Sequence, residues 1–467
     1  MTEKYDLVIL GSGSAAFAAA IKASEFDAKV AMIERETIGG TCVNVGCVPS
    51  KHLLTVGETY YSAETHDFEG IRLRQESFNM KMVISDKRKV VAALRREKYV
   101  NVLKAIPKVS LVKGHAQFSS KKEVKVGSRV FQAEKFIIAT GSSPIIPPFQ
   151  GITDVKYLTN VEALDLQHLP KSLVVVGGRA LALEFAQMYE HFGTKVTVLQ
   201  RSPRIIPEEE PEISEMLRLY LLEEGIDIRT GVEIRAVRKE GRKKVVTAKV
   251  GARVRDFVGD ELLIATGRRP NTFDLQLDKV GVRLGEDGIL LVNDEMHTTA
   301  PHVWGAGDVT GRPMLETTAA KEGAIASENA LKGAKRKMDF YAVPHAVFTM
   351  PQVASVGLTE AKATEKFGAC SCRVLEMSLV PKARVVKDTR GVIKMVINPK
   401  TREIVGVHIL SPLAADIIHE AVLAVKYHLT IDDIIDTVHV FPTMGESIKL
   451  AAQAFIRDIS KISCCIE

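Results

Sequence analysis

One pattern occurs twice in the chain and limits the folds open to it more than any other feature. Each copy has a short apolar strand, a glycine turn, a helix and a second strand; the first covers residues 5–34 and the second covers 172–201. Strands that alternate with helices in this way are typical of βαβ units and a parallel sheet. The predicted elements are strands at 5–10, 29–33, 172–176 and 195–199, a helix ending near residue 23 and a helix at 181–191.

The sequence that follows each copy is also repeated. An apolar strand ends in Ala-Thr-Gly at 139–141, and another does so at 265–267. We therefore predict an α/β protein with two Rossmann-like dinucleotide-binding domains, the second inserted in the first. Strands at 392–397 and 404–409 and helices at 414–427 and 446–459 indicate a further α/β domain. The first domain is predicted to cover residues 1–148 and to continue at 268–338, and the second domain, inserted between these parts, covers 149–267. A proline-rich linker is predicted at 142–148, and the C-terminal domain covers 339–467.

Composition excludes several classes of protein. The 467 residues correspond to roughly three domains at about 150 residues each. With 46% hydrophobic and 26% charged residues the chain is neither disordered nor fibrous, and a net charge of +6 without a basic block gives no reason to expect nucleic-acid binding. No apolar run approaches the roughly 18 residues of a membrane span, and the chain enters its first strand without a signal peptide. We therefore expect a cytoplasmic protein that binds neither nucleic acid nor membrane.

The first glycine turn has the features of a dinucleotide site. Gly11-Ser12-Gly13-Ser14-Ala15-Ala16 fits the G-x-G-x-x-G/A fingerprint, in which Gly11 permits a tight turn and Gly13 lets the backbone approach a pyrophosphate. Ala16 allows close packing of helix and strand. Glu34 lies 23 residues after Gly11, where an acid accepts hydrogen bonds from a ribose diol. The alternative is a structural turn with Glu34 on a solvated edge.

The second glycine turn departs from the fingerprint. Gly177 keeps the first glycine position, but Arg179 occupies the second, and Gln200-Arg201 stands where the strand-end acid is expected, with Arg204 close behind. An acid repels a 2′-phosphate, whereas arginine binds it in a forked geometry. The sequence therefore predicts NADPH in preference to NADH, unless the two arginines are ordinary solvated side chains.

A close cysteine pair is the strongest chemical signal. The segment 39–51 reads Gly-Gly-Thr-Cys-Val-Asn-Val-Gly-Cys-Val-Pro-Ser-Lys and contains Cys42, Cys47 and Lys51. The glycines precede a predicted helix whose N-terminus lowers a thiol pKa, and Lys51 adds positive charge. Four intervening residues allow a disulfide to form and open. In a chain without a disulfide framework, redox chemistry is favoured over two inert core thiols.

Segment 39–51, both glycine turns, both Ala-Thr-Gly strands and Gly305-Ala306-Gly307-Asp308 together resemble the flavin disulfide reductase family. The resemblance implies FAD in the first domain, NAD(P)H in the second, and a homodimer joined through the C-terminal domain. It also implies that Cys47 faces the flavin, that Cys42 exchanges with substrate, and that Lys51 pairs with Glu184. The implied FAD ligands are Gly11, Gly13, Ala15, Ala16, Glu34, Gly40, Thr41, Lys51, Gly141 and Asp308; those for NADPH are Gly177, Arg201 and Gly267.

Two C-terminal features indicate the branch of the family. Members that act on thiols carry His-x-His-Pro, and its second histidine is the acid/base; here the segment starting at His439 has Phe441 in that position. Phenylalanine cannot transfer protons, and such help is worth about 10²–10⁴-fold. The adjacent Cys464 and Cys465 suit a soft metal ion. The chain therefore resembles the mercuric reductases, and the expected reaction is NADPH-dependent reduction of Hg(II) to Hg(0), with Cys42, Cys47, Cys464 and Cys465 as metal ligands.

Several alternatives stay open at this level. His439 is expected to be structural, although it is the one candidate for a substitute base; a disulfide reductase or a metal-sequestering flavoprotein with little turnover are the competing functions. Mercuric reductases usually carry Tyr where Phe441 stands, and many have an N-terminal metal-binding domain. Here the tail, small thiols or a metal-binding partner is expected to deliver the ion to an active site shared between subunits. Cys370 and Cys372 lie outside the family pattern and are either structural or incidental, or they form an extra metal site.

Overall fold

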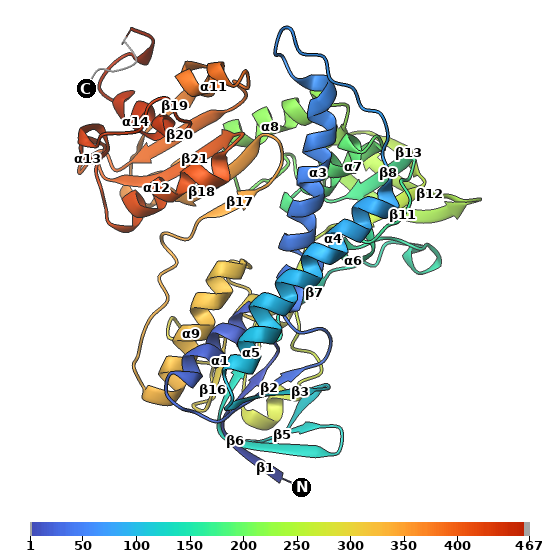
Figure 1. Cartoon of the computed structure of the whole chain (residues 1–467), viewed down its shortest axis with the longest axis vertical. Helices are drawn as coiled ribbons and strands as arrows, with labels where there is room; N and C mark the ends of the chain where they lie inside the picture. The colour runs from blue at the N-terminus through green and yellow to red at the C-terminus, as the bar shows by residue number, and fades with distance from the viewer. Residues whose placement is uncertain (1, 462–467) are drawn as a thin grey trace. The chain divides into compact units, whose positions relative to one another are not determined.

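The computed structural model describes residues 2–461, so Met1 and residues 462–467, including Cys464 and Cys465, lie outside the described residues. The chain divides into two units (Figure 1). Unit 1 comprises 1–52, 82–145 and 267–339; unit 2 comprises 53–81, 146–266 and 340–467. Each unit is therefore assembled from three separate stretches of sequence. No helix within residues 2–461 is long and apolar enough to cross a membrane.

Unit 1 contains a mostly parallel sheet in the order β3-β2-β1-β6-β5-β4, with β16 paired to β6. Its centre is β1, which has a parallel neighbour on each edge and whose residues 7–10 are fully buried. The late strand β16 pairs in parallel with β6, so residues around 304 complete a sheet begun at residue 2. The strands are β1 Thr2–Leu10, β2 Val30–Glu34, β3 Val109–Lys113, β4 Ala116–Ser120, β5 Glu123–Val126, β6 Arg129–Ile138 and β16 Val303–Gly305.

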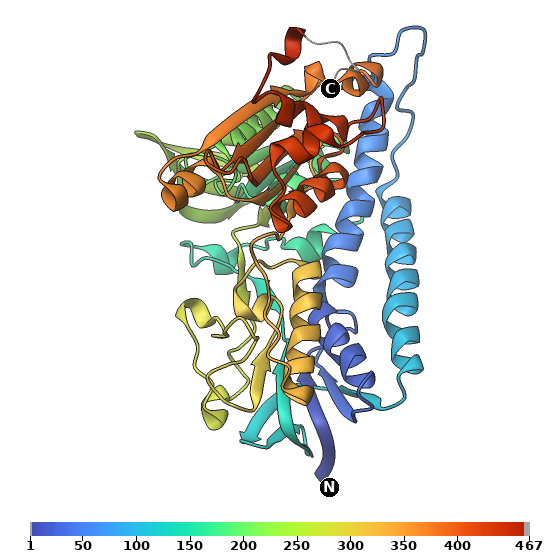
Figure 2. The same ribbon diagram turned by 90° about the vertical axis from the view of Figure 1, so that its left-hand side faces the viewer.

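Helices α1 (Ser14–Ser24) and α9 (Glu316–Lys332) lie side by side in unit 1, as Figures 1 and 2 both show. Their close contact depends on a small residue, since a Cβ at Gly323 would come within 2.0 Å of the carbonyl oxygen of Ala15. Five of the six alanines of α1 are buried, namely those at 15, 16, 19, 20 and 23. Four further α-helices follow β2 in the sequence: α2 (Gly40–Val45), α3 (Cys47–Thr65), α4 (Met80–Arg95) and α5 (Asn101–Ala105).

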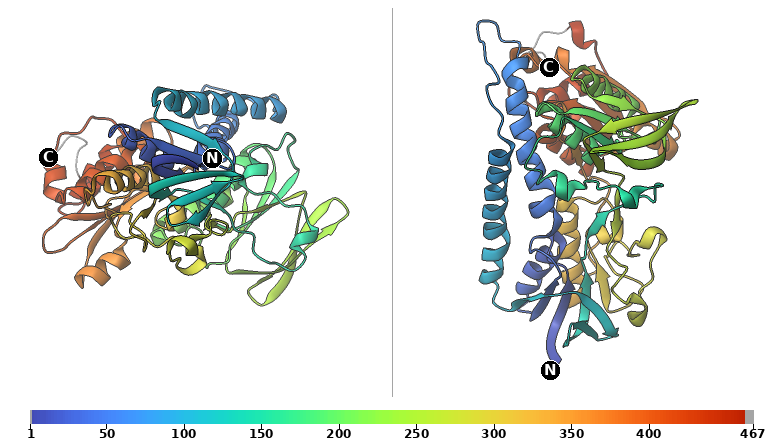
Figure 3. Two further views of the ribbon diagram at one scale, coloured as in Figure 1. Left: turned by 90° about the horizontal axis from the view of Figure 1, so that it is seen from below. Right: turned by 90° about the vertical axis from the view of Figure 1, so that its right-hand side faces the viewer.

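The nucleotide-binding part of unit 2 has a parallel sheet in the order β10-β9-β8-β14. A three-stranded antiparallel sheet, β11-β12-β13, follows as a twisted ribbon, drawn in yellow-green in Figure 3. The strands are β8 Ser172–Val176, β9 Lys195–Leu199, β10 Asp227–Arg229, β11 Val232–Glu240, β12 Lys243–Val250, β13 Arg253–Gly259 and β14 Glu261–Ile264; the helices are α7 Ala180–His191 and α8 Pro211–Glu223.

The C-terminal part of unit 2 is a five-stranded antiparallel sheet in the order β17-β18-β21-β20-β19. Alternate residues of β20 face opposite sides: Ile393 and Met395 join the main core with α12, whereas Val396 packs with α10. Both faces are covered, which explains why every residue of β20 and β21 is buried. The elements are β17 His345–Val347, β18 Gln352–Gly357, α10 Glu360–Phe367, β19 Ser371–Glu376, β20 Val392–Ile397, β21 Ile404–Ser411, α12 Ala414–Lys426, α13 Ile431–Asp436 and α14 Glu446–Gln453.

Two sequence-based expectations need correction. The helix expected at 446–459 ends at Gln453, because the chain turns through residues 454–456 without a glycine or proline that the sequence pattern could reveal. The expected linker at 142–148 begins as a strand, β7 (Ser142–Pro144), which pairs with β15 (Arg268–Pro270). A proline can occupy such a two-stranded edge because its missing N–H is not needed there.

Candidate active site

The cysteine pair is held against the first glycine turn by a close backbone approach. Gly40 has a φ of +65°, and a Cβ at that position would lie 2.6 Å from the Cα of Gly13. Gly39 also has a positive φ and precedes α2, so the chain reverses sharply before Cys42. Cys42 lies within α2, and Cys47 is the first residue of α3. Glycine at 13 and 40 therefore brings the cysteine segment onto the turn predicted to bind a pyrophosphate.

The two thiols interact directly and have different acidities. A hydrogen bond from Cys42 lowers the pKa of Cys47 to about 7, with further help from the positive charge of Lys51. The same hydrogen bond, burial and the nearby Cys47 raise the pKa of Cys42. The sequence predicts a thiol of lowered pKa in this segment, and in the structure that thiol is Cys47, because two adjacent thiolates repel each other and only one ionises readily.

The surface exposure of the pair also differs. Cys47 is exposed and Cys42 is half-buried in the chain. Glu316, at the start of α9, places a negative charge near both thiols and accepts a hydrogen bond from Ser14 over 3.1 Å between Oγ and Oε1. Sequence reasoning did not identify Glu316, since it lies almost 270 residues from the pair and belongs to none of the motifs recognised.

The first glycine turn has the geometry of a dinucleotide cradle. Gly11 has a φ of +117°, and a Cβ there would lie 2.1 Å from the carbonyl oxygen of Ala139. Gly13 caps α1 without a side-chain hydrogen bond, so the first N–H groups of the helix point toward the turn. Glu34 ends β2 and accepts a hydrogen bond from Ser12 over 2.6 Å. These features fit a bound FAD: a narrow turn, free helix N–H groups and an acid beside them.

A second group of polar residues in unit 1 lies after β6. Ser142 donates a hydrogen bond from Oγ to Asp308 over 2.6 Å and accepts one from Nε of Arg268 over 2.7 Å. Glu322 lies nearby and accepts from the N–H of Gly307, while burial raises its pKa to about 7. Its other oxygen, Oε1, is buried without a hydrogen-bond partner among residues 2–461. A buried acceptor of this kind fits a site that a polar cofactor completes.

The second glycine turn repeats the backbone geometry of the first. Gly177 has a φ of +125°, and a Cβ there would lie 2.2 Å from the carbonyl oxygen of Ala265. The alanine of each Ala-Thr-Gly segment therefore crosses the first glycine of its own unit, which explains why the two motifs recur together in the sequence. Gly267 lies two residues beyond Ala265, at the first position of a unit 1 segment, and its role toward NADPH stays a prediction.

Gln200 shapes the loop that carries the two arginines. Its side chain is buried and packs on Gly178, where a Cβ would come within 2.8 Å. Its amide accepts a hydrogen bond from the N–H of Arg201 over 3.1 Å and donates one to the carbonyl of Arg204 over 3.2 Å. Both contacts use backbone atoms of the arginines, so the guanidinium groups are not needed to hold the loop. Among the described residues neither guanidinium has an acidic partner.

Glu184 is fixed inside unit 2 on α7. Its side chain is 5% exposed, and Oε1 accepts a hydrogen bond from the N–H of Phe348 over 2.9 Å. Lys51 belongs to unit 1, so the predicted pairing of Glu184 with Lys51 stays a prediction.

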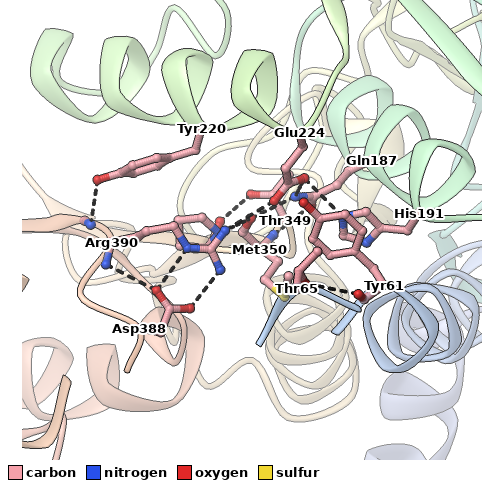
Figure 4. A network of polar contacts seen from close by, with 12 residues as sticks. Tyr61, Thr65, Gln187, His191, Tyr220, Glu224, Thr349, Met350, Asp388 and Arg390 are labelled. Atoms are coloured by element: carbon pink, nitrogen blue, oxygen red, sulfur yellow. Dashed lines mark hydrogen bonds and ion pairs between the residues drawn. The ribbon is translucent and has the colours of Figure 1, made fainter. Parts of the chain in front are cut away.

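A buried carboxylate, Glu224, anchors the far end of α7 (Figure 4). It accepts hydrogen bonds from Gln187 over 2.7 Å and from His191 over 3.0 Å, and Arg390 approaches its second oxygen at 3.2 Å. His191 also stacks on Tyr61 of α3 at 4.1 Å between ring centroids. Because charges with this little exposure are stable only when paired, the network fixes α7, the helix that carries Glu184.

In the C-terminal segment an apolar residue, Phe441, occupies the position of the family's acid/base histidine. Phe441 is 46% exposed and is followed by Pro442. Both ring nitrogens of His439 face acceptors: Nδ1 donates to the carbonyl of Thr437 over 2.9 Å and Nε2 lies 2.8 Å from the carboxylate of Glu420. Both nitrogens are therefore engaged in local structure. Cys464 and Cys465 lie outside the described residues.

Comparison with family models matches nearly the whole chain. The model described as pyridine nucleotide-disulphide oxidoreductase matches residues 5–323, and the model for the dimerisation domain of the same group matches residues 343–452. The second match lies in the five-stranded sheet of unit 2 and its helices, and indicates a homodimer.

Individual relatives give the same result. The chain is 42% identical to a mercuric reductase of Staphylococcus aureus over 461 residues, which covers 99% of this chain and 84% of that protein. It is also 42% identical to a mercuric reductase of Streptomyces lividans, over 99% of this chain and 98% of that protein. Among solved structures, the Cu(II) complex of the HOCl-induced flavoprotein disulfide reductase RclA of Escherichia coli has a TM-score of 0.88 at 28% identity, covering 97% of this chain and 100% of that one.

Proposed function

Since the chain belongs to the pyridine nucleotide-disulphide oxidoreductase family, we propose that it reduces Hg(II) to Hg(0) with electrons from NADPH, through FAD and the pair Cys42 and Cys47. The observation that carries the proposal is the thiol–thiolate pair itself, in a chain that shares 42% of its residues with mercuric reductases. Two neighbouring sulfurs of this kind hold a soft, thiophilic cation.

FAD would be held in unit 1 by the turn at Gly11 and Gly13, by Glu34 and by the polar group around Asp308. When bound, it supplies the two-electron link between the nicotinamide and the sulfur pair. The hydrogen bond from Cys42, helped by the positive charge of Lys51, lowers the pKa of Cys47 to about 7, so about half of this thiol is ionised at neutral pH. The pKa of Cys42 is raised, so Cys42 keeps its proton until the ion arrives. Binding of Hg(II) then forms two S–Hg bonds and releases the proton of Cys42. Uptake of two electrons by the ion breaks both bonds and leaves two thiolates.

Phe441 and His439 favour a metal over a disulfide as the electron acceptor. Cleavage of a disulfide substrate leaves a thiolate that must be protonated, and neither a phenylalanine nor a histidine engaged on both nitrogens supplies that proton. Reduction of a metal ion held by two thiolates needs no such proton. We therefore assign the replacement at Phe441 to substrate choice.

Delivery of the ion to the active site is assigned to the C-terminal cysteines. Cys464 and Cys465 are proposed to collect Hg(II) and pass it by thiolate exchange to Cys42 and Cys47 of the partner subunit. Small thiols or a separate metal-binding protein would bring the ion to this tail. Arg201 and Arg204 are proposed to select NADPH by contacting its 2′-phosphate.

The direct test measures NADPH oxidation by the FAD-loaded enzyme with and without Hg(II), together with the release of volatile mercury. Oxidation that depends on Hg(II) and yields mercury vapour supports the proposal, and Cys42→Ser or Cys47→Ser should abolish both. Ser50→Ala provides a matched control, because Ser50 only donates a hydrogen bond to the carbonyl of Cys47 over 3.1 Å. Rapid reduction of lipoamide or glutathione disulfide with no response to Hg(II) would instead identify a disulfide reductase.

A further inference from the structure

A second pair of cysteines lies on one face of the C-terminal sheet in unit 2. Cys372 belongs to β19, the edge strand, and Cys370 immediately precedes that strand. Residues two apart on an extended strand point to the same side. Both cysteines pack against the same small apolar cluster, formed by Ala363, Val396 and Val405, which confirms that they share a face.

Helix α10 covers this face and supplies one polar partner to each sulfur. Thr364 donates a hydrogen bond from Oγ1 to Sγ of Cys370 over 3.2 Å. Glu360, one helical turn earlier, accepts a hydrogen bond from the thiol of Cys372. Because Thr364 and Glu360 are four residues apart on α10, they lie on one side of the helix and match the spacing of the two cysteines. The two sulfurs are therefore neighbours between a helix and a strand.

Both thiols are reduced, half-buried and accessible from the surface. Neither sulfur is part of a disulfide, and both side chains are intermediate in exposure. Burial and the carboxylate of Glu360 raise the pKa of Cys372 to about 11, so this thiol is protonated at neutral pH and reacts slowly with ordinary electrophiles. A thiophilic metal can still displace the proton, because the metal–sulfur bond replaces the sulfur–hydrogen bond.

The surroundings select a particular kind of cation. Among residues 2–461 no group of three or more His, Cys, Asp or Glu side chains is placed to hold a metal ion. Zinc in structural sites takes four protein ligands, so this pair does not meet its requirement. A divalent ion bound by two thiolates forms a neutral unit, and a neutral unit suits the apolar side of this site, which is formed by Val396, Val405 and Phe367. The pair thus fits a soft cation that is satisfied by two sulfurs.

We propose that Cys370 and Cys372 form a second thiol site, separate from Cys42 and Cys47, which binds one Hg(II) ion per chain. In the binding step two S–H bonds break, two Hg–S bonds form, and two protons leave to solvent or to the small thiolates that carried the ion. No electrons are transferred, so the site stores the ion without reducing it. The inference concerns binding alone and does not depend on the turnover proposed above.

The test uses the FAD-loaded enzyme in which Cys42, Cys47, Cys464 and Cys465 are all replaced by serine, leaving two of the six cysteines. Hg(II) is added with an excess of free cysteine as competitor, and the metal retained after gel filtration is counted. We expect one Hg(II) per chain and release of two protons on binding. Additional substitution Cys370→Ser or Cys372→Ser should lower the affinity at least tenfold, whereas Ser371→Ala, between the two, should leave it unchanged.

Three results would overturn the inference. The first is that no metal is retained, and the second is that two ions are retained per chain, which would mean that each thiol binds an ion separately. The third is that metal is still retained after either cysteine is replaced. Zn(II) retained as well as Hg(II) would overturn the proposed selectivity. Should the four-serine protein fail to fold, the wild-type enzyme and its Cys370→Ser/Cys372→Ser variant answer the same question. The variant should bind one fewer equivalent of Hg(II) while NADPH oxidation at saturating Hg(II) stays at the wild-type rate. Equal stoichiometry in the two proteins would refute the site.

Discussion

Removing the guanidinium of Arg201 tests the proposal that the second nucleotide site distinguishes NADPH from NADH. A hydrogen bond to a charged group contributes about 1.5–3 kcal/mol, and tenfold in rate corresponds to about 1.4 kcal/mol. Arg201→Ala should therefore lower kcat/KM for NADPH by roughly 10- to 150-fold. The side chain is exposed, which favours the lower end of that range because solvent weakens the interaction.

Arg201→Ala leaves the loop intact, so a change in kcat/KM can be attributed to the missing guanidinium. Gln200 holds the loop through the backbone N–H of Arg201 and the backbone carbonyl of Arg204, and neither contact involves a guanidinium. The free energy of unfolding should therefore stay within about 0.5 kcal/mol of wild type. Arg204→Ala should act in the same direction, and the double variant should lose more than either single one.

The assay compares initial rates of NADPH and NADH oxidation at saturating Hg(II). NADH has no 2′-phosphate, so its kcat/KM should be unchanged in the variants and serves as an internal control. Arg242→Ala, which removes an exposed arginine from the turn between β11 and β12, is the matched control for loss of one positive charge. An equal loss with both nucleotides, or no loss with NADPH, would refute the reasoning.

Three further predictions concern stability, acid–base chemistry and pH. Lys394 is 1% exposed and its ammonium group lies 2.7–3.0 Å from three carboxylates, so Lys394→Met should lower the free energy of unfolding, measured by urea denaturation, by about 3–5 kcal/mol. Lys362→Met, on the surface, should change the free energy of unfolding by less than about 0.5 kcal/mol, and equal effects of the two substitutions would contradict the burial argument. His439→Ala should leave Hg(II)-dependent turnover within a few-fold of wild type, and a loss beyond about 100-fold would make His439 the missing base. Cys42 and Lys51 lower the pKa of Cys47 to about 7, so the thiolate fraction of Cys47 rises between pH 6 and pH 8. In the reduced enzyme the rate of Cys47 alkylation by iodoacetamide, followed by peptide mass spectrometry, should therefore increase about tenfold from pH 6 to pH 8 and then level off. A rate that continues to rise above pH 9 would indicate an ordinary thiol.

The repeated βαβ pattern predicted the centre of each nucleotide sheet closely, because buried parallel strands read as short apolar runs. The strands predicted at 172–176 and 195–199 have those bounds in the structure. The strand predicted at 392–397 also has the predicted bounds; it is antiparallel and belongs to the C-terminal sheet, but it too is a short apolar run because both its faces are buried. The glycine positions were also informative, since Gly11 and Gly177 each meet a carbonyl that only a residue without a side chain can approach.

Other features depend on contacts between distant residues and left no local signal. Glu316 approaches the cysteine pair from the start of α9, and Glu224 is paired only because α7 and the loop at Arg390 lie next to it. In the sequence Gln200 is noticed only because it replaces the acid expected at the end of the strand. In the structure its side-chain amide holds the loop that carries Arg201 and Arg204. Hydrophobic periodicity describes which face of an element is buried, and it carries no information about which polar groups meet there.

The pairing of β16 with β6 has a consequence for synthesis on the ribosome. About 165 residues separate the end of β6 from the start of β16, and at about 5–20 residues per second they take roughly 8–33 s to translate. During that interval residues 136–138 of β6 lack the strand β16 that pairs with them, while the inserted stretch 146–266 emerges and is free to fold. The stretch 146–266 can therefore fold before the sheet of unit 1 is completed by β16. A chaperone that binds β6 would act during this interval.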